Sequence, residues 1–169
     1  MASDLTLRLA TFPTPLGAFT VVASDEGVVA TTTGDAEALL DELARRVGTV
    51  PRPDTRGLAS VRRELEDYFA GRLRRLSTPV DLRLVGTPFA RAVLDVTRRI
   101  PYGQLWTYGD VAGHAGRPGA ARAAGTVLRR CPIEVFVPCH RVVPAGPGLG
   151  RYGGDEDRRA FLLRLERAV

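Results

Sequence analysis

Two short helical patterns separated by a four-residue turn constrain the fold of this chain more than any other feature. The first pattern covers residues 108–115 and the second covers residues 120–130. The turn between them, Gly116-Arg117-Pro118-Gly119, is rich in the residue types that end helices and reverse the chain. Helix, glycine-containing turn and helix is the helix-turn-helix layout, which is common in nucleic-acid-binding domains.

The second of these two helices is almost bare of large side chains. Its first residues are Ala-Ala-Arg-Ala-Ala-Gly, and among them only Arg122 extends far from the backbone. A bare helix can approach a nucleic-acid backbone closely, and it can equally pack closely against another helix. The pattern therefore leaves both interpretations open.

The remaining patterns divide the chain into a strand-and-helix half and a helical half, which predicts an α+β protein. Thr87 is a plausible N-cap for a helix that starts with Pro88. Turn residues near residues 78–87 indicate a boundary, so we expect a scaffold domain over residues 1–80 and a second domain over residues 85–169. The expected strands cover residues 5–10, 18–23, 28–32 and 133–137, and the further expected helices cover residues 35–46, 58–69, 88–100 and 155–169.

The net positive charge of the chain comes entirely from its second half. All 24 basic residues are arginine, and the formal net charge is +5. Residues 1–84 carry 11 arginines and 12 acidic residues, whereas residues 85–169 carry 13 arginines and 7 acidic residues. The absence of lysine is typical of a GC-rich coding sequence. The uneven placement suits a polyanion-binding domain, although a basic solvated face would look the same.

The two cysteines, Cys131 and Cys139, are expected to be free thiols. The N-terminus does not resemble a signal peptide and no apolar run is long enough to span a membrane, so we expect a cytoplasmic protein without a disulfide. Together with His114 and His140 they could supply four zinc ligands, but no pair has the close spacing that zinc sites use. No metal is therefore expected.

The segment Pro138-Cys139-His140-Arg141-Val142 carries the most chemical information. It places a thiol after a rigid proline at the end of an apolar run, next to an imidazole and a guanidinium. Positive neighbours and a base increase the thiolate fraction of a cysteine. A buried structural cysteine would show the same sequence, so the segment alone leaves both roles open.

Several ordered motifs make the chain resemble the O6-alkylguanine-DNA alkyltransferases, also called methylated-DNA–protein-cysteine methyltransferases. The resemblance covers nearly the whole chain and implies a ribonuclease H-like N-terminal domain and a winged-helix-like C-terminal domain with a helix-turn-helix. The motifs are Thr14-Pro-Leu-Gly17, Tyr68-Phe-Ala-Gly71, Ile100-Pro-Tyr-Gly103, Tyr108-Gly-Asp-Val-Ala112, Ala120-Ala-Arg-Ala123, Pro138-Cys-His-Arg-Val142 and Gly150-Arg-Tyr-Gly-Gly154.

The resemblance implies a single irreversible transfer of an alkyl group from guanine O6 to the sulfur of Cys139, without a cofactor. Tyr108 matches the phenol that helps the guanine anion to leave. His140 matches a base that reaches the thiol through a water molecule, and Glu166 matches the carboxylate that orients this histidine. The thioether product is a poor leaving group, so the protein is expected to act once.

The resemblance also implies a partner, double-stranded DNA that contains O6-alkylguanine, bound by a monomer and not by a membrane. Arg122 matches an arginine that fills the space left when the alkylated nucleotide rotates out of the duplex. The small residues beside it, including Ala121 and Ala123, would let the helix enter the minor groove. Arg129 and Arg141 are expected to contact phosphates, and Val142, Tyr152 and Gly153 match the pocket for the flipped base.

One departure from the family pattern bears on activity. The family has asparagine eight residues before the acceptor cysteine, at a hinge, where this chain has Cys131. Ala90 and Leu94 also replace the usual glutamine and tryptophan. A protein that binds alkylated bases without transferring the group is therefore an alternative. A Cys-His hydrolase is a further alternative, for which no oxyanion-hole motif is found.

Overall fold

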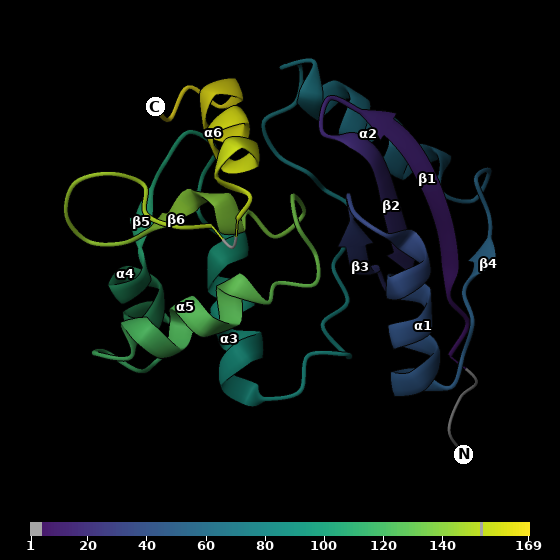
Figure 1. Cartoon of the computed structure of the whole chain (residues 1–169), viewed down its shortest axis with the longest axis horizontal. Helices are drawn as coiled ribbons and strands as arrows, with labels where there is room; N and C mark the ends of the chain where they lie inside the picture. Colours follow the sequence, from purple (N-terminus) through teal and green to yellow (C-terminus); the bar gives the residue numbers. More distant parts are fainter. Residues whose placement is uncertain (1–4, 153) are drawn as a thin grey trace. The chain divides into compact units, whose positions relative to one another are not determined.

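The computed structural model describes residues 5–152 and 154–169. The chain forms two compact units, residues 1–82 and residues 83–169, and each is described by itself (Figure 1). Within the described residues, no helix is long and apolar enough to cross a membrane.

The first unit contains a four-stranded sheet in the order β3-β2-β1-β4 and two helices (Figure 1). Its three longer strands are antiparallel neighbours, and β1 and β2 form a hairpin in which Thr14 pairs with Gly17. Asp35 caps the first helix by accepting hydrogen bonds from two backbone amides of its first turn. The elements are β1 (Arg8–Thr14), β2 (Gly17–Ala23), β3 (Val28–Thr32), α1 (Ala36–Val47), β4 (Arg52–Pro53) and α2 (Ala59–Phe69).

The second unit is mainly helical. Thr87 caps α3 with Pro88 at its first position, as the sequence predicted, and Thr107 and Asp110 form a reciprocal capping box at the start of α4. The elements are α3 (Pro88–Arg98), β5 (Trp106–Thr107), α4 (Tyr108–His114), α5 (Ala121–Arg129), the 3-10 helix η1 (Cys139–Arg141), β6 (Val142–Val143) and α6 (Glu156–Leu165).

The predicted helix-turn-helix is confirmed by α4 and α5, which are joined by a turn that contains two glycines with positive φ, Gly116 and Gly119. Both helices pack against α3, and the apolar side chains of Val93, Val111 and Leu128 are buried. The two-residue strands β5 and β6 pair in parallel. The α+β class, with a small sheet domain and a helical domain, is as the sequence predicted.

The strand predicted over residues 133–137 is wrong, because this segment forms a turn. The amide of Val137 donates to the carbonyl of Ile133 at 3.0 Å, and Val135 lies in the left-handed region with a φ of 72°. Short apolar runs do not distinguish a buried strand from a buried turn, since both hide the same side chains. The turn reverses the chain immediately before Cys139.

Candidate active site and nucleic-acid interface

Cys139 is the first residue of η1, and it is buried but lines an open groove. Its side chain is only 3% exposed, and its amide donates to the carbonyl of Val137 at 2.8 Å. Burial, a hydrogen bond with the Cys131 thiol and the nearby Glu134 carboxylate all raise the pKa of the Cys139 thiol. The resting thiol is therefore protonated at neutral pH, and its reactivity requires a base.

The groove has a volume of about 1070 Å³ and belongs to the second unit. It combines the Cys139 thiol with a phenol from α4 and arginines from α5. Of the sequence-predicted site residues it brings together Tyr108, Ala121, Arg122, Arg129, Cys139 and Tyr152. Ala123, Cys131, His140, Arg141, Val142 and Glu166 are not among its lining residues.

His140, Arg141 and Glu166 form a buried network behind the groove. Nε2 of His140 lies 2.8 Å from one carboxylate oxygen of Glu166. Arg141 donates to both oxygens of Glu166, at 2.7 and 2.9 Å, and to the carbonyl of Ile100 at 2.6 Å. Burial would raise the pKa of Glu166, but the hydrogen bonds from His140 and Arg141 outweigh it and hold this pKa far below its ordinary value.

The network fixes the protonation state of His140. Burial lowers the pKa of this imidazole more than Glu166 raises it, so the ring is neutral at pH 7. An ionised carboxylate only accepts hydrogen bonds, so Nε2 carries the ring proton and Nδ1 carries a lone pair. Nδ1 is buried and has no hydrogen-bond partner among the described residues. It is therefore available to accept a proton.

Arg141 does not lie where the sequence led us to expect it. Its side chain is buried, and Nε, Nη1 and Nη2 all donate within the network. A guanidinium satisfied in this way has no free face for a phosphate, so the expectation that Arg141 contacts DNA is wrong. The partner that fixes it, Glu166, lies 25 residues further along the chain and could not be identified from local charge.

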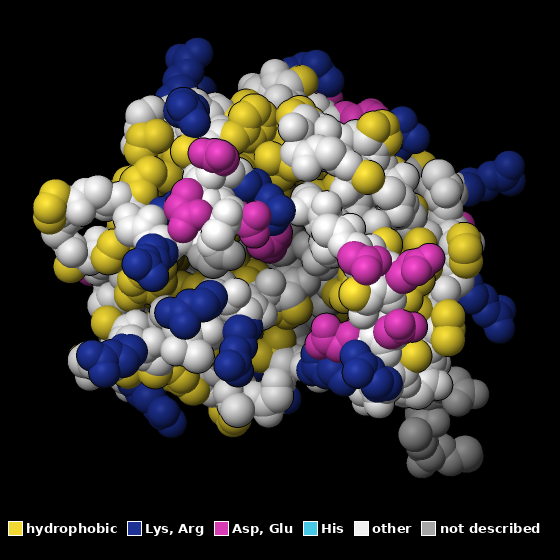
Figure 2. All heavy atoms as spheres, viewed as in Figure 1, with side chains coloured by type: hydrophobic (Ala, Val, Ile, Leu, Met, Phe, Trp, Pro, Cys, Tyr) yellow, Lys and Arg dark blue, Asp and Glu magenta, His cyan; other side chains and the backbone are white. Residues whose placement is uncertain are grey.

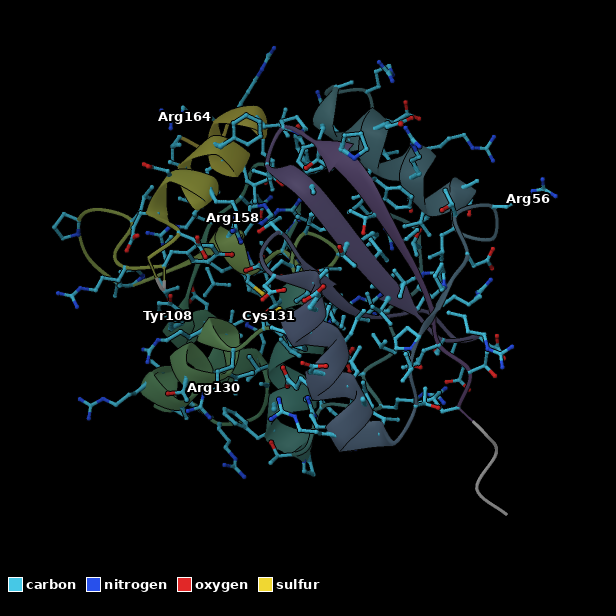
Figure 3. All side chains as sticks on the ribbon, turned by 45° about the vertical axis from the view of Figure 1, so that its right-hand side comes forward. Arg56, Tyr108, Arg130, Cys131, Arg158 and Arg164 are labelled. Atoms are coloured by element: carbon cyan, nitrogen blue, oxygen red, sulfur yellow. The ribbon has the colours of Figure 1, made fainter. Side chains whose placement is uncertain are left out.

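Tyr108 begins α4 and faces the groove (Figure 3). Burial raises the pKa of its phenol, and the guanidinium groups of Arg159 and Arg129 reduce but do not cancel this shift. The phenol therefore keeps its proton at neutral pH. It can donate a hydrogen bond to a group in the groove.

The helix α5 presents an arginine-rich surface. Arg122 and Arg129 are exposed and line the groove, whereas Ala123 is exposed outside it. Figure 2 shows basic side chains gathered over α4 and α5, and because the chain has no lysine all of them are arginines. Three arginines of the second unit, Arg122, Arg129 and Arg151, line the groove.

The three residues expected to form a base pocket differ in what the structure shows of them. Val142 is fully buried in β6, where it pairs with Trp106 of β5. Tyr152 lines the groove, and burial raises its pKa well above the ordinary value. Gly153 lies outside the described residues.

The sequence analysis missed two arginines on α6. Arg159 is 1% exposed, donates to the carbonyls of Gly150 and Arg151, and lies 5.1 Å from the ring centre of Tyr152. Arg158 donates to Glu134 at 2.8 Å, which ties α6 to the turn before Cys139 (Figure 3).

The spacing of residues along α6 could have identified Arg159 as buried. The buried face of α6 and its C-cap consists of Arg159, Leu162, Leu163 and Glu166, which have the i, i+3, i+4, i+7 pattern. Phe161 and Leu165 of the same helix are only half-buried.

Comparisons with known proteins define the class. Residues 7–82 match the model of the 6-O-methylguanine DNA methyltransferase, ribonuclease-like domain, and residues 88–168 match that of the 6-O-methylguanine DNA methyltransferase, DNA binding domain. The chain therefore belongs to the O6-methylguanine DNA methyltransferase family.

Named relatives and solved structures agree with this membership. The chain is 35% identical over 158 residues to the constitutive methylated-DNA–protein-cysteine methyltransferase of Bacillus subtilis, covering 93% of each chain. It is 43% identical over 122 residues to the methylated-DNA–protein-cysteine methyltransferase of Mycolicibacterium paratuberculosis, covering 72% of each. A structure of Mycobacterium tuberculosis OGT in complex with DNA matches 95% of this chain and 93% of its own, with a TM-score of 0.80 and 33% identity.

Proposed function

We propose that this protein repairs DNA by transferring the alkyl group of O6-alkylguanine irreversibly to Sγ of its own Cys139. The observation that carries the proposal is the position of Cys139, which lines an open groove together with two protonated phenols and three arginines. His140, the next residue in the chain, is neutral and is hydrogen-bonded to the Glu166 carboxylate. A buried structural cysteine would not need a groove beside it.

The chemistry follows from the protonation states. Nδ1 of His140 accepts the Cys139 proton through a bridging water, and the resulting imidazolium is stabilised by Glu166. The thiolate attacks the alkyl carbon; the S–C bond forms as the C–O6 bond breaks, and the electron pair stays on the guanine. Tyr108 donates a hydrogen bond to the purine as this negative charge develops. The thioether cannot be expelled again, so each chain acts once.

Access to the alkyl group requires the nucleotide to leave the duplex, because the buried Cys139 thiol cannot reach a guanine that remains stacked. We assign Arg122 to the space that the nucleotide vacates, with Ala121 and Ala123 allowing α5 to approach the minor groove. Arg129 contacts the phosphate backbone, which makes binding salt-dependent. Tyr152, which lines the groove, holds the flipped base. The reaction needs one chain, one duplex and no cofactor.

The proposal is tested by the stoichiometry of transfer from a duplex that carries a labelled methyl group on one guanine O6. With DNA in excess, we expect the label in the protein fraction to rise to about one methyl group per chain and then stop. Tight binding of the duplex without label transfer would instead indicate a damage-binding protein. Continued release of small labelled product would indicate a hydrolase.

Replacing Arg122 with alanine should slow repair of duplex DNA by about 10- to 100-fold, because unstacking costs a few kcal/mol and each 1.4 kcal/mol is a factor of ten. Transfer from free O6-methylguanine base, which needs no unstacking, should change less than about twofold. Both rates are measured by single-turnover label transfer.

The matched control is Arg130→Ala, which removes an exposed arginine that does not line the groove. This variant should weaken duplex binding slightly and should have little effect on the rate of duplex repair or on the rate of transfer from the free base. An equal loss of both rates in Arg122→Ala would contradict the proposed role in nucleotide rotation.

A further inference from the structure

We propose that Arg158 and Glu134 are positioning residues, which hold the turn before Cys139 against α6 and thereby keep the acceptor sulfur aligned for transfer. Nη1 of Arg158 donates to a carboxylate oxygen of Glu134 at 2.8 Å. Glu134 lies in the turn and lines the groove, whereas Arg158 projects from α6 (Figure 3). The inference deepens the proposed function and rests on it, because its effect is on the rate of alkyl transfer.

The turn has a conformation that its own sequence disfavours. Val135 has a φ of 72°, where the Cβ of a β-branched residue crowds the backbone. Residues in such conformations persist only where the surrounding structure holds them. A hydrogen bond from the amide of Val137 to the carbonyl of Ile133, at 3.0 Å, closes the turn. Burial of the apolar side chains is non-directional, so it does not by itself fix how the turn is oriented.

The ion pair with Arg158 supplies a directional anchor. Arg158 lies in the first half of α6, a helix whose Leu162 and Leu163 are buried. Its guanidinium also lies 3.3 Å from the carboxylate of Asp155, so it is held between two carboxylates. The side chains of Arg158 and Glu134 are only 22% and 27% exposed. A charge-assisted hydrogen bond at this depth is stronger than a neutral one and is screened less than a surface pair.

A short and stiff segment transmits the position of the turn to the acceptor sulfur. Only four residues separate Glu134 from Cys139. Among them Pro138 has a ring-restricted φ of −78°, and the amide of Cys139 donates to the carbonyl of Val137 at 2.8 Å. A rotation of the turn would therefore move Sγ. Displacement at carbon requires the sulfur to approach in line with the breaking C–O6 bond, and a misplacement of about 1 Å can lower a rate by about 100-fold.

The pair also controls the charge beside the sulfur. Burial is the main cause of the raised pKa of the Cys139 thiol, and the Glu134 carboxylate adds to it, which disfavours the attacking thiolate. Burial likewise raises the pKa of Glu134, and the charge and hydrogen bond of Arg158 oppose this shift. The guanidinium thus offsets negative charge at this end of the groove. Loss of Arg158 alone should therefore slow transfer at least as much as loss of both side chains.

The test measures single-turnover methyl transfer over a range of duplex concentrations for the wild type, Arg158→Ala, Glu134→Ala and the double variant. Arg158→Ala should lower the maximal rate by about tenfold or more, and Glu134→Ala by about threefold or more. The duplex concentration that gives half of the maximal rate should change by less than about twofold, because the pair acts on the reacting sulfur and not on DNA binding. The double variant should be no slower than Arg158→Ala, because both substitutions break the same interaction.

Two further variants separate positioning from a general loss of stability. Arg158→Lys keeps a positively charged donor on the same helix, so its maximal rate should recover to within about threefold of the wild type. Arg164→Ala removes an exposed arginine of α6 that donates to the carbonyl of Ala160, and it should change neither parameter by more than about twofold. Hydrogen exchange of the Val137 and Cys139 amides should be faster by about tenfold or more in Arg158→Ala.

Two outcomes would overturn the inference. One is a full maximal rate in Arg158→Ala; the other is a double variant whose loss equals the product of the two single losses, as for side chains that act independently. If the wild-type protein transfers no methyl group, the proposed function fails, while amide exchange still tests whether the pair holds the turn. Unchanged exchange in Arg158→Ala would then overturn the inference.

Discussion

Replacing Cys139 with serine should abolish methyl transfer and leave duplex binding intact. A serine hydroxyl is far less acidic than a thiol and is a weak nucleophile without strong activation, and the neutral His140 is a modest base. We expect the transfer rate to fall by about 1,000-fold or more, equivalent to about 4 kcal/mol of barrier. Single-turnover label transfer gives the rate, and titration of the same duplex gives the affinity.

The matched control is Cys131→Ser, which makes the same replacement of sulfur by oxygen at the other cysteine. This variant should still accept a methyl group, because Cys131 does not line the groove. If Cys139→Ser took up label and Cys131→Ser did not, the acceptor would be misassigned.

Replacing Glu166 with alanine should lower the free energy of unfolding of the second unit by about 3–5 kcal/mol, the usual cost of leaving a buried charge without its partner. Arg141 would keep its hydrogen bond to the carbonyl of Ile100 but lose both of its hydrogen bonds to Glu166, and His140 would lose the acceptor of its Nε2 proton. Trp106, the single tryptophan, lies in this unit, so its fluorescence in denaturant unfolding reports the change.

Asp157→Ala is the control, since it removes an exposed carboxylate from the same helix. Its effect should remain below about 1 kcal/mol, as for most surface substitutions. Equal destabilisation by both variants would mean that the buried network is not the origin of the loss.

The same network predicts that the second unit loses stability in acid. The folded pKa values of His140 and Glu166 are both lower than the ordinary values, so the unfolded chain binds these protons more readily. The contribution of His140 is lost as the pH falls below about 6.5, and that of Glu166 below about 4.3. Unfolding measured below about pH 4.3 should therefore show a smaller acid dependence in Glu166→Ala, because the carboxylate that titrates there is absent.

The sequence predicts the elements whose ends are set by local chemistry. Asp35 and Thr87 are side-chain caps, and the helices α1 and α3 begin where these residues indicated. The segment 133–137 was misassigned because a short apolar run fits a buried strand and a buried turn equally well. Strands β5 and β6, of two residues each, are too short to produce an alternating pattern.

Only those residues of the candidate site that lie within a recognisable sequence motif could be predicted. Of the residues that the resemblance singles out, Tyr108, Arg122 and Cys139 line one groove, and their roles remain predictions. The burial of Arg141 depends on its two hydrogen bonds to Glu166, 25 residues further along the chain, so it is a property of the tertiary structure.

The position of the transferred methyl group is the most direct test of the account. Protein that has reacted with an O6-methylguanine duplex is digested and its cysteine-containing peptides are fragmented in the mass spectrometer. We predict one added methyl group, of about 14 Da, on Cys139 and none on Cys131. A methyl group on Cys131, or unmodified cysteines after complete loss of O6-methylguanine from the DNA, would contradict transfer to Cys139.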